Sequence, residues 1–188
     1  RYFPGPTGAP DIKEIIIMRE CGMLLPVASL PSRYGIGAFS KEAYDFIDTL
    51  KAAGQSWWQI LPLGPTGFGD SPYQSFSAFA GNPYFIDLEK LTEEGLLTKE
   101  ECRDVDFGSN ERDIDYKKIY DGRFPLLRKA YERWKDGRAA EQVHGLAVQK
   151  LGHETREYCF YMAVKNHFDS CSWNLWDEGI RLRKPEAL

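Results

Sequence analysis

Residues 57–73 read WWQILPLGPTGFGDSPY, and this stretch decides the fold class of the chain. Its first seven residues form an apolar run that is typical of a buried strand and too short for an ordinary helix. The glycines and prolines that follow disfavour regular structure, yet the segment through Phe85 is rich in aromatic rings and hydroxyls. A loop that only connects two elements would be shorter and more polar. Rings combined with hydroxyls and a carboxylate suit a sugar, whose C–H faces stack on aromatic side chains.

Two interpretations of this aromatic loop stay open. In the first, the loop folds onto a small core of its own, made by Phe76, Phe79 and Phe85. In the second, the loop holds a ligand through Asp70, Ser71 and Tyr73, because the flanking Gly69 and Pro72 give the backbone special dihedral angles. Polar groups on a stiff loop at the C-terminal end of a strand are where α/β folds place ligand sites.

The segments before this loop predict a strand–helix–strand unit. An apolar run from Met23 to Ser29 predicts a first strand, and Ser40 is a suitable N-cap for a helix from Lys41 to Ala53. Gly54 stands where a C-cap glycine ends a helix. The second strand, Ser56 to Leu63, is apolar except for Gln59, as expected for a strand covered on both faces. This order predicts a βαβ unit with a right-handed crossover.

After this unit the hydrophobic periodicity becomes helical. Residues 87–95 predict a short helix with a glycine stop, and Thr98 with Glu101 forms a capping box. Longer helices are predicted at 116–135, with Asp113 and Asp115 as caps, and at 139–168. One face of the first carries Phe124, Leu127, Tyr131 and Trp134. No strand signal returns before the end of the sequence.

Composition narrows the class of function. The chain has 188 residues, 43% of them hydrophobic and 28% charged, as in a globular protein. A net charge of −4 argues against nucleic-acid binding. No apolar run is long enough to span a membrane. The spacing of the cysteines and histidines suggests no metal site and favours free thiols in a reducing cytoplasm: Cys21, Cys102, Cys159, Cys171, His144, His153 and His167.

Two long motifs resemble one enzyme family. Residues 61–83, LPLGPTGFGDSPYQSFSAFAGNP, and residues 22–37, GMLLPVASLPSRYGIG, resemble amylomaltase, the 4-alpha-glucanotransferase of glycoside hydrolase family 77. Ala53-Gly54-Gln55 and Trp58-Gln59 match the same family. The resemblance runs from about Gly22 to the C-terminus and implies an α/β fold, a partial TIM barrel holding its first strands, with a mostly helical inserted subdomain. A complete barrel typically needs roughly 250 residues.

The chain is expected to divide into three parts. Residues 1–17 are expected to be a leader or a remnant that takes no part in the fold, and residues 18–87 the N-terminal part of the catalytic barrel. Residues 88–188 are expected to form the helical insertion that leads toward a third strand. Its Trp173 and Trp176 are expected to be packing anchors. Two strands alone leave open edges, which predicts either self-association or rearranged packing.

The resemblance implies a sugar site but no catalytic residue in this chain. Ser71 and Tyr73 match loop positions that contact glucose units near the cleavage point, and Asp70 lies beside them. Phe68 stands where some relatives have a tyrosine at a secondary glucan-holding groove, and Tyr116 matches the other aromatic of that groove. Retaining transfer needs two carboxyl groups about 5–5.5 Å apart. The family's three catalytic acids follow later barrel strands, so the chain alone is expected to be inactive.

The function predicted on this basis is transfer of 1,4-alpha-glucan segments between maltooligosaccharides, in a cytoplasmic enzyme that needs no cofactor. Two alternatives stay open: a non-catalytic glucan-binding module, and a helical interaction domain based on the segments after Tyr116. The second alternative predicts no binding of maltooligosaccharide and no effect of Tyr73→Ala.

Overall fold

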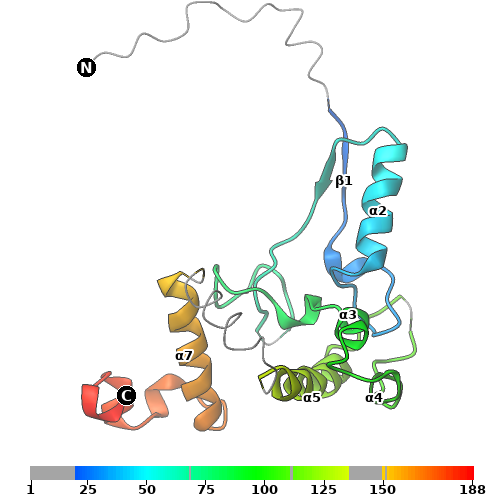
Figure 1. Cartoon of the computed structure of the whole chain (residues 1–188). Coiled ribbons are helices and arrows are strands. Elements are labelled where there is room, and N and C mark those ends of the chain that lie inside the picture. Colours follow the sequence, from blue (N-terminus) through cyan, green and yellow to red (C-terminus); the bar gives the residue numbers. More distant parts are fainter. Residues whose placement is uncertain (1–19, 68, 111, 136–149, 151) are drawn as a thin grey trace, which may run out of the picture.

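The computed structural model describes residues 20–67, 69–110, 112–135, 150 and 152–188. The predicted leader, residues 1–17, lies outside these ranges. The chain begins with two strands and a helix and continues mainly as helices (Figure 1). The α-helices after the strands are α3 (Leu88–Glu93), α4 (Lys99–Arg103), α5 (Tyr116–Lys135), α7 (His153–His167) and α8 (Glu178–Arg181).

The predicted strand–helix–strand unit is confirmed, with shorter strands. β1 (Gly22–Leu24) pairs in parallel with β2 (Trp57–Gln59), and α2 (Lys41–Ala52) lies alongside both (Figure 1). The prediction of a first strand through Ser29 is wrong, because Pro26 has no N–H for the ladder and residues 27–29 form the 3-10 helix η1. The second strand is also shorter than predicted. Because the chain after β1 turns away at Pro26, β2 has no described pairing partner beyond Gln59, and Pro62 lies three residues further on.

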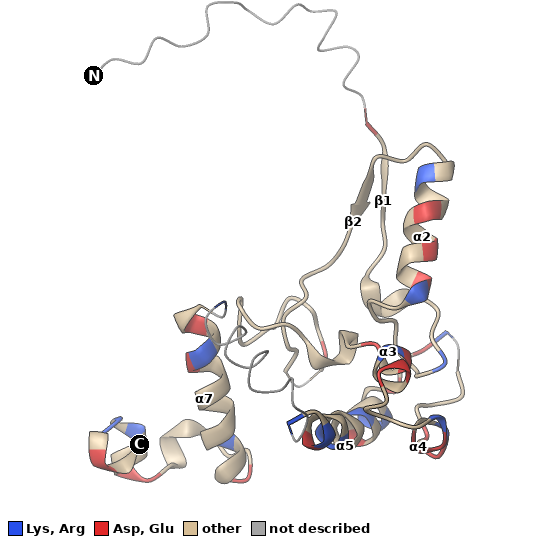
Figure 2. Cartoon of the chain, in the orientation of Figure 1, with Lys and Arg blue, Asp and Glu red and all other residues tan. Residues whose placement is uncertain are grey.

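The expectation that the second strand is covered on both faces is wrong for the described residues. Trp58 packs edge-on against Phe46 of α2, with ring centroids 5.1 Å apart. Trp57, on the other face of the strand, is 63% exposed. Neither strand carries a charged residue (Figure 2), and the Trp57 indole N–H donates to the carboxylate of Glu20 just before β1. This face, which also carries exposed Gln59, is open in the described residues.

The ends of α2 show one prediction confirmed and one modified. Gly54 has a positive φ of 71° just beyond the helix, as a C-cap glycine should. Ser40 occupies the N-cap position, but its side chain makes no capping bond. Instead, Ser40 Oγ donates to Glu42 Oε2 at 2.5 Å. The expected apolar face of α2 buries Ala43 and Leu50, whereas Ile47 remains 46% exposed.

The short helices that follow begin and end where their caps predict. Asp87 accepts from the N–H of Glu89 at the start of α3, and Gly95 has a positive φ after its end. Thr98 and Glu101 form the predicted capping box of α4. Asp115 Oδ1 accepts from the N–H of Lys118 at 3.1 Å and caps α5. No capping bond of Asp113 is among the described hydrogen bonds.

The core is built around α5, on a different stripe from the aromatic face seen in the sequence. The helix buries Ile119, Gly122, Arg123, Leu126 and Ala130. Of the face noted in the sequence, Leu127 packs against the buried cluster, whereas Phe124 and Tyr131 are 38% and 49% exposed. The buried cluster joins residues from both sides of the predicted boundary at residue 87: Ile36, Tyr84, Leu88, Leu97, Cys102, Phe107, Ile119, Leu126 and Ala130.

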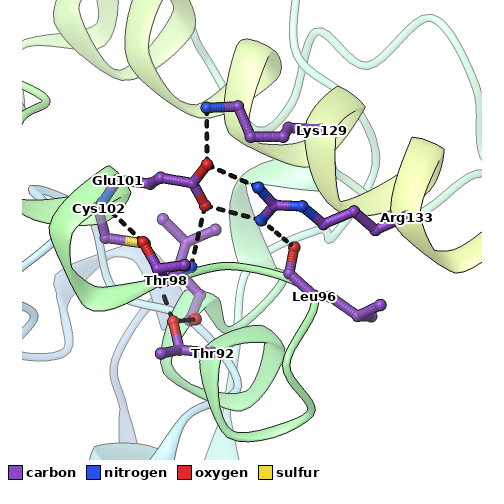
Figure 3. A network of polar contacts seen from close by, with 8 residues as sticks. Thr92, Leu96, Thr98, Glu101, Cys102, Lys129 and Arg133 are labelled. Atoms are coloured by element: carbon purple, nitrogen blue, oxygen red, sulfur yellow. Dashed lines mark hydrogen bonds and ion pairs between the residues drawn. The ribbon is translucent and has the colours of Figure 1, made fainter.

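Glu101 links α4 to α5 through hydrogen bonds and an ion pair (Figure 3). Its carboxylate accepts two hydrogen bonds from the Arg133 guanidinium, at 2.7 and 2.8 Å, and lies 2.9 Å from Lys129 Nζ. Arg133 also donates to the carbonyl of Leu96 at 3.0 Å. These cations and the Thr98 N–H stabilise the ionised carboxylate, which holds the pKa of Glu101 far below its usual range.

The C-terminal helices form a separate aromatic group. Trp176 is buried and stacks on Phe168 at 5.8 Å, which confirms it as a packing anchor. Trp173 is 54% exposed, so the same expectation is wrong for that residue. The helix predicted over 139–168 is described only as α7, because residues 136–149 and 151 lie outside the described ranges. All four cysteines are free thiols.

Candidate functional site

The loop after β2 folds back on itself near its start. Thr66 and Ser75 form an isolated antiparallel bridge, and the Ser75 hydroxyl lies within hydrogen-bond distance of the carbonyl oxygens of Pro65 and Ser77, at 2.9 and 2.7 Å. A Cβ atom at Gly64 would lie 2.2 Å from Ser75 Oγ. Glycine is therefore needed at position 64 for this close approach, and the loop is held by local bonds rather than by a sheet.

Asp70 lies at the tip of this turn in a conformation that few residues adopt. Its φ is 52°, in the left-handed region where aspartate is tolerated better than most side chains. Its N–H donates to the carbonyl of Gly67 at 3.1 Å, and its Oδ1 accepts from Thr66 Oγ1 at 3.0 Å. The second carboxylate oxygen has no described hydrogen-bond partner, so it is available to a ligand.

A pocket of about 170 Å³ brings Asp70 together with Tyr116. Its wall combines η1 and the loop after β2 with the start of α5, and also includes Thr66, Pro72, Asn82, Tyr84 and Ile114. Tyr84 and Tyr116 lie with ring centroids 6.3 Å apart. Two of the residues predicted for the sugar site, 46 positions apart in sequence, therefore line one cavity.

The tyrosines of this pocket are kept neutral. Burial and the negative charge of Asp70 raise the pKa of Tyr84 to about 12. The same two causes raise the pKa of Tyr116. Both phenols therefore keep their protons at neutral pH and can donate hydrogen bonds to a neutral ligand.

The other predicted residues lie outside this pocket lining. Ser71 is half-buried, and its carbonyl accepts from the N–H of Gln74 at 3.0 Å. Tyr73 is 74% exposed on the outside of the loop. Phe68 lies outside the described residues. The structure thus joins Asp70 with Tyr116 and leaves Ser71 and Tyr73 on the neighbouring surface.

The two interpretations of the loop phenylalanines are resolved differently for each residue. Phe85 is half-buried and packs against both buried clusters. Phe76 and Phe79 are 52% and 64% exposed, so the expected small loop core does not form from them. The Phe76 ring lies 6.0 Å from that of Tyr158 in α7. The end of the loop is instead anchored by Phe85 and by buried Tyr84, which also lines the pocket.

Tyr84 is a site residue that the sequence analysis missed. Asn82 caps the 3-10 helix η2 (Pro83–Phe85) by accepting from the N–H of Tyr84 at 3.0 Å, and this turn directs the ring into the pocket wall. The Asn82-Pro83 pair signals such a turn. Nothing in the local sequence indicates that the tyrosine would meet Asp70.

This pocket lacks the groups for glycosidic bond cleavage among its described lining residues. Asp70 is the one acid in its lining among the described residues, and a retaining mechanism needs two. The described residues contain no cluster of three or more His, Cys, Asp or Glu side chains that could hold a metal. None of the described helices has both the length and the apolar character required to cross a bilayer.

Comparisons with known proteins agree on one family. The family model for glycoside hydrolase family 77, described as 4-alpha-glucanotransferase, matches residues 25–188. A 4-alpha-glucanotransferase of Streptococcus pneumoniae serotype 4 is 48% identical over 171 residues, which are 90% of this chain and 34% of that protein. One from Thermus thermophilus is 42% identical over 172 residues, 90% of this chain and 33% of the relative.

A solved structure gives the same result. The amylomaltase from Streptococcus agalactiae in complex with acarbose superposes with a TM-score of 0.82 at 38% identity, over 90% of this chain and 34% of that one. The chain thus spans about a third of the length of the relatives it matches. With most of its residues matched by the family model, the chain belongs to glycoside hydrolase family 77, the 4-alpha-glucanotransferases.

Proposed function

We propose that this chain is the N-terminal part of a 4-alpha-glucanotransferase and supplies one wall of its glucan site. The observation that carries the proposal is the pocket in which Asp70 and Tyr116 meet. A carboxylate oxygen that can accept and neutral phenols that can donate match the hydroxyls of glucose, and the tyrosine rings match its C–H faces. The substrate would be a maltooligosaccharide, and the amylomaltase neighbour bound to acarbose supports this class.

In this proposal the loop residues outside the pocket lining extend the site. Ser71 and Tyr73 would contact glucose units near the cleavage point, and the exposure of the Tyr73 ring makes it available for stacking. Phe68 and Tyr116 would hold a more distant part of the chain. Phenylalanine at 68 keeps a stacking face but lacks a phenol to donate a hydrogen bond.

The fold assignment supports the same proposal. β1 and β2 would be the first two strands of a TIM barrel, since they are parallel and joined by a helix. The loop with Asp70 follows the C-terminal end of β2, the end at which TIM-barrel enzymes place their active sites. Residues 88–188 would then be a largely helical insertion before the third strand.

The chemical step needs acids beyond this pocket. Retaining transfer uses one carboxylate as nucleophile and a second carboxyl group as acid and base. Asp70 alone cannot fill both roles, so we propose that the 188-residue chain binds glucan without transferring it. Measuring glucose released from maltotriose by the purified chain tests this part, and release above a no-protein control would refute it.

Binding is tested with single variants. Maltotriose titrated into the 15N-labelled chain should shift the backbone amides of Asp70, Ile114 and Tyr116. Tyr116→Ala should weaken binding about tenfold, the equivalent of about 1.4 kcal/mol from lost stacking and a lost hydrogen bond. Tyr131→Ala removes a half-exposed tyrosine elsewhere on α5 and should change nothing.

The outcomes separate the rival functions. A chain that shows no saturable shifts at these amides would favour the helical interaction domain. If the protein encoded by the complete reading frame also binds maltotriose but transfers no glucose, the non-catalytic binding module is supported instead.

A further inference from the structure

A second, larger pocket lies away from the Asp70 pocket. Its volume is about 590 Å³, within the range of small-molecule sites at about 300–1,000 Å³. The first turn of α2 forms one side, through Lys41, Glu42 and Tyr44, and α3 forms another, through Glu89, Lys90 and Glu93. No residue is shared between the linings of the two pockets.

Two aromatic rings at this pocket are not buried in the core. Phe39 is 47% exposed and Tyr44 is 69% exposed, and both line the pocket. Phe39 touches Phe85 edge-on, with ring centroids 6.1 Å apart, and this contact fixes its position. Rings held at the edge of a polar cavity give C–H groups of a ligand a surface on which to stack.

The charges around the pocket balance. Its lining carries four basic and four acidic side chains: Arg33, Lys41, Lys90, Arg123, Glu42, Asp87, Glu89 and Glu93. An anion site or a cation site would show an excess of the opposite sign. Balanced charges supply many hydrogen-bond donors and acceptors without a net field, which suits a neutral ligand rich in hydroxyl groups.

Several of these side chains are already held in place. Tyr34 Oη donates to Glu89 Oε2 at 2.7 Å, and Arg33 Nη1 lies 3.8 Å from the same oxygen. Glu42 accepts from Ser40 Oγ at 2.5 Å. Each carboxylate therefore keeps further acceptor positions on a side chain whose orientation is set by the protein.

Arg123 is the most deeply buried polar residue of the lining, at 1% exposure. Its guanidinium donates to the carbonyl of Ile86, but its buried Nε–H has no hydrogen-bond partner among the described residues. Burial lowers its pKa to about 10, and Asp87 acts against this shift. Buried donors without partners are rare in folded proteins and call for an explanation. Asp87, whose Oδ1 accepts from the N–H of Glu89 at 2.9 Å, lines the same pocket.

We propose that this pocket between α2 and α3 is a second carbohydrate site, which binds a neutral glucose oligosaccharide by stacking on Tyr44 and Phe39 and by hydrogen bonds to Glu89 and Asp87. The choice of a glucose oligosaccharide rests on the proposed function, whereas the preference for a neutral polyol follows from the lining itself. A site here would hold glucan outside the groove that contains Asp70 and Tyr116.

The test is a titration of the 15N-labelled chain with maltotriose, glucose 6-phosphate and glucosamine. Maltotriose should shift the amides of Ser40, Lys41, Glu89 and Lys90 in a saturable way, and the two charged sugars should bind at least about tenfold more weakly. Tyr44→Ala should weaken this binding about tenfold and leave the shifts at Asp70 and Tyr116 unchanged. Tyr131→Ala is the matched control, because it also removes an exposed helical tyrosine but one that does not line the pocket.

Three results would overturn the inference: no saturable shifts at the α2–α3 amides, tighter binding of either charged sugar there, or equal binding by Tyr44→Ala. Glu89→Gln gives a second check, since it keeps the side chain's size and its acceptor for Tyr34 Oη while removing the charge, and it should weaken binding several-fold. Shifts at α2–α3 without shifts at Asp70 and Tyr116 would refute the proposed glucan wall and leave the second site standing. Shifts at Asp70 and Tyr116 without shifts at α2–α3 would refute the second site and leave the proposed glucan wall standing.

Discussion

Replacing Ile119 by alanine should cost more stability than any nearby surface change. Ile119 is 0% exposed and belongs to the cluster that joins α5 to Ile36, Tyr84 and Leu88. The substitution removes three carbons, worth about 0.8 kcal/mol each in transfer free energy, or about 2.4 kcal/mol together. The cavity left behind should raise the loss to about 3–4 kcal/mol, within the usual range of about 2–5 kcal/mol for isoleucine to alanine.

Urea unfolding followed by far-UV circular dichroism measures this loss. With a slope of about 2 kcal/mol per molar urea, the midpoint should fall by about 1.5–2 M. If the alanine variant does not fold, Ile119→Val provides a milder step and should cost about 0.5–1.5 kcal/mol. Arg128→Ala, at an exposed position of the same helix, is the control and should stay within about 0.5 kcal/mol of the parent chain. An Ile119→Ala midpoint indistinguishable from that of Arg128→Ala would show that this cluster is not the core.

Three further predictions concern charge, backbone and surface. The pKa of Glu101 is lowered in the folded state, so its contribution to stability is present at neutral pH and is lost as the pH falls below about 4.3. Glu101→Gln should therefore lower the unfolding temperature at pH 7, and the difference from the parent chain should shrink in acid. A constant difference in unfolding temperature from pH 7 to pH 3 would contradict this. Gly35 and Gly54 both have positive φ, but only at Gly35 would a Cβ atom meet backbone, 2.3 Å from the carbonyl oxygen of Phe107. Gly54→Ala should lower the free energy of unfolding by about 1–2 kcal/mol, and Gly35→Ala should lower it clearly more. Equal losses of stability in urea unfolding would show that the clash at Gly35 is relieved. The open face at Trp57 and the unpaired strand edges predict self-association of the chain. Light scattering should detect it as a mass that rises with concentration, and Trp57→Lys should reduce this rise. A monomer at all concentrations would exclude it.

Local sequence was sufficient for the features that depend on a few neighbouring residues. The capping box of Thr98 and Glu101, the cap at Asp115 and the bounds of α5 all appear where the sequence predicts them. The order of strand, helix and parallel strand is also confirmed. Caps and helical periods involve residues three or four positions apart, so the chain's near neighbours determine them.

Which side chains are buried could not be predicted from local sequence, because burial depends on the elements that pack against a side chain. The sequence placed Phe124, Leu127 and Tyr131 on one face, and of these Leu127 packs against the core cluster. The fully buried residues of α5, such as Ile119 and Arg123, lie on another stripe of the helix. Helical spacing identifies which residues share a face, but only the neighbouring elements decide which face is covered. The strands were predicted too long for a related reason: a ladder needs a partner, and β1 turns away at Pro26.

The candidate site also depends partly on local sequence and partly on tertiary packing. The sequence by itself determined that a stiff loop with Asp70 follows a strand, because its glycines and prolines act through their own dihedral angles. Only the tertiary structure decided that Asp70 meets Tyr84 and Tyr116 in one pocket, and that Tyr73 stays outside its lining. Those contacts join segments brought together by packing around α5, and the free energy of that packing comes from burial of apolar surface rather than from any local preference of the chain.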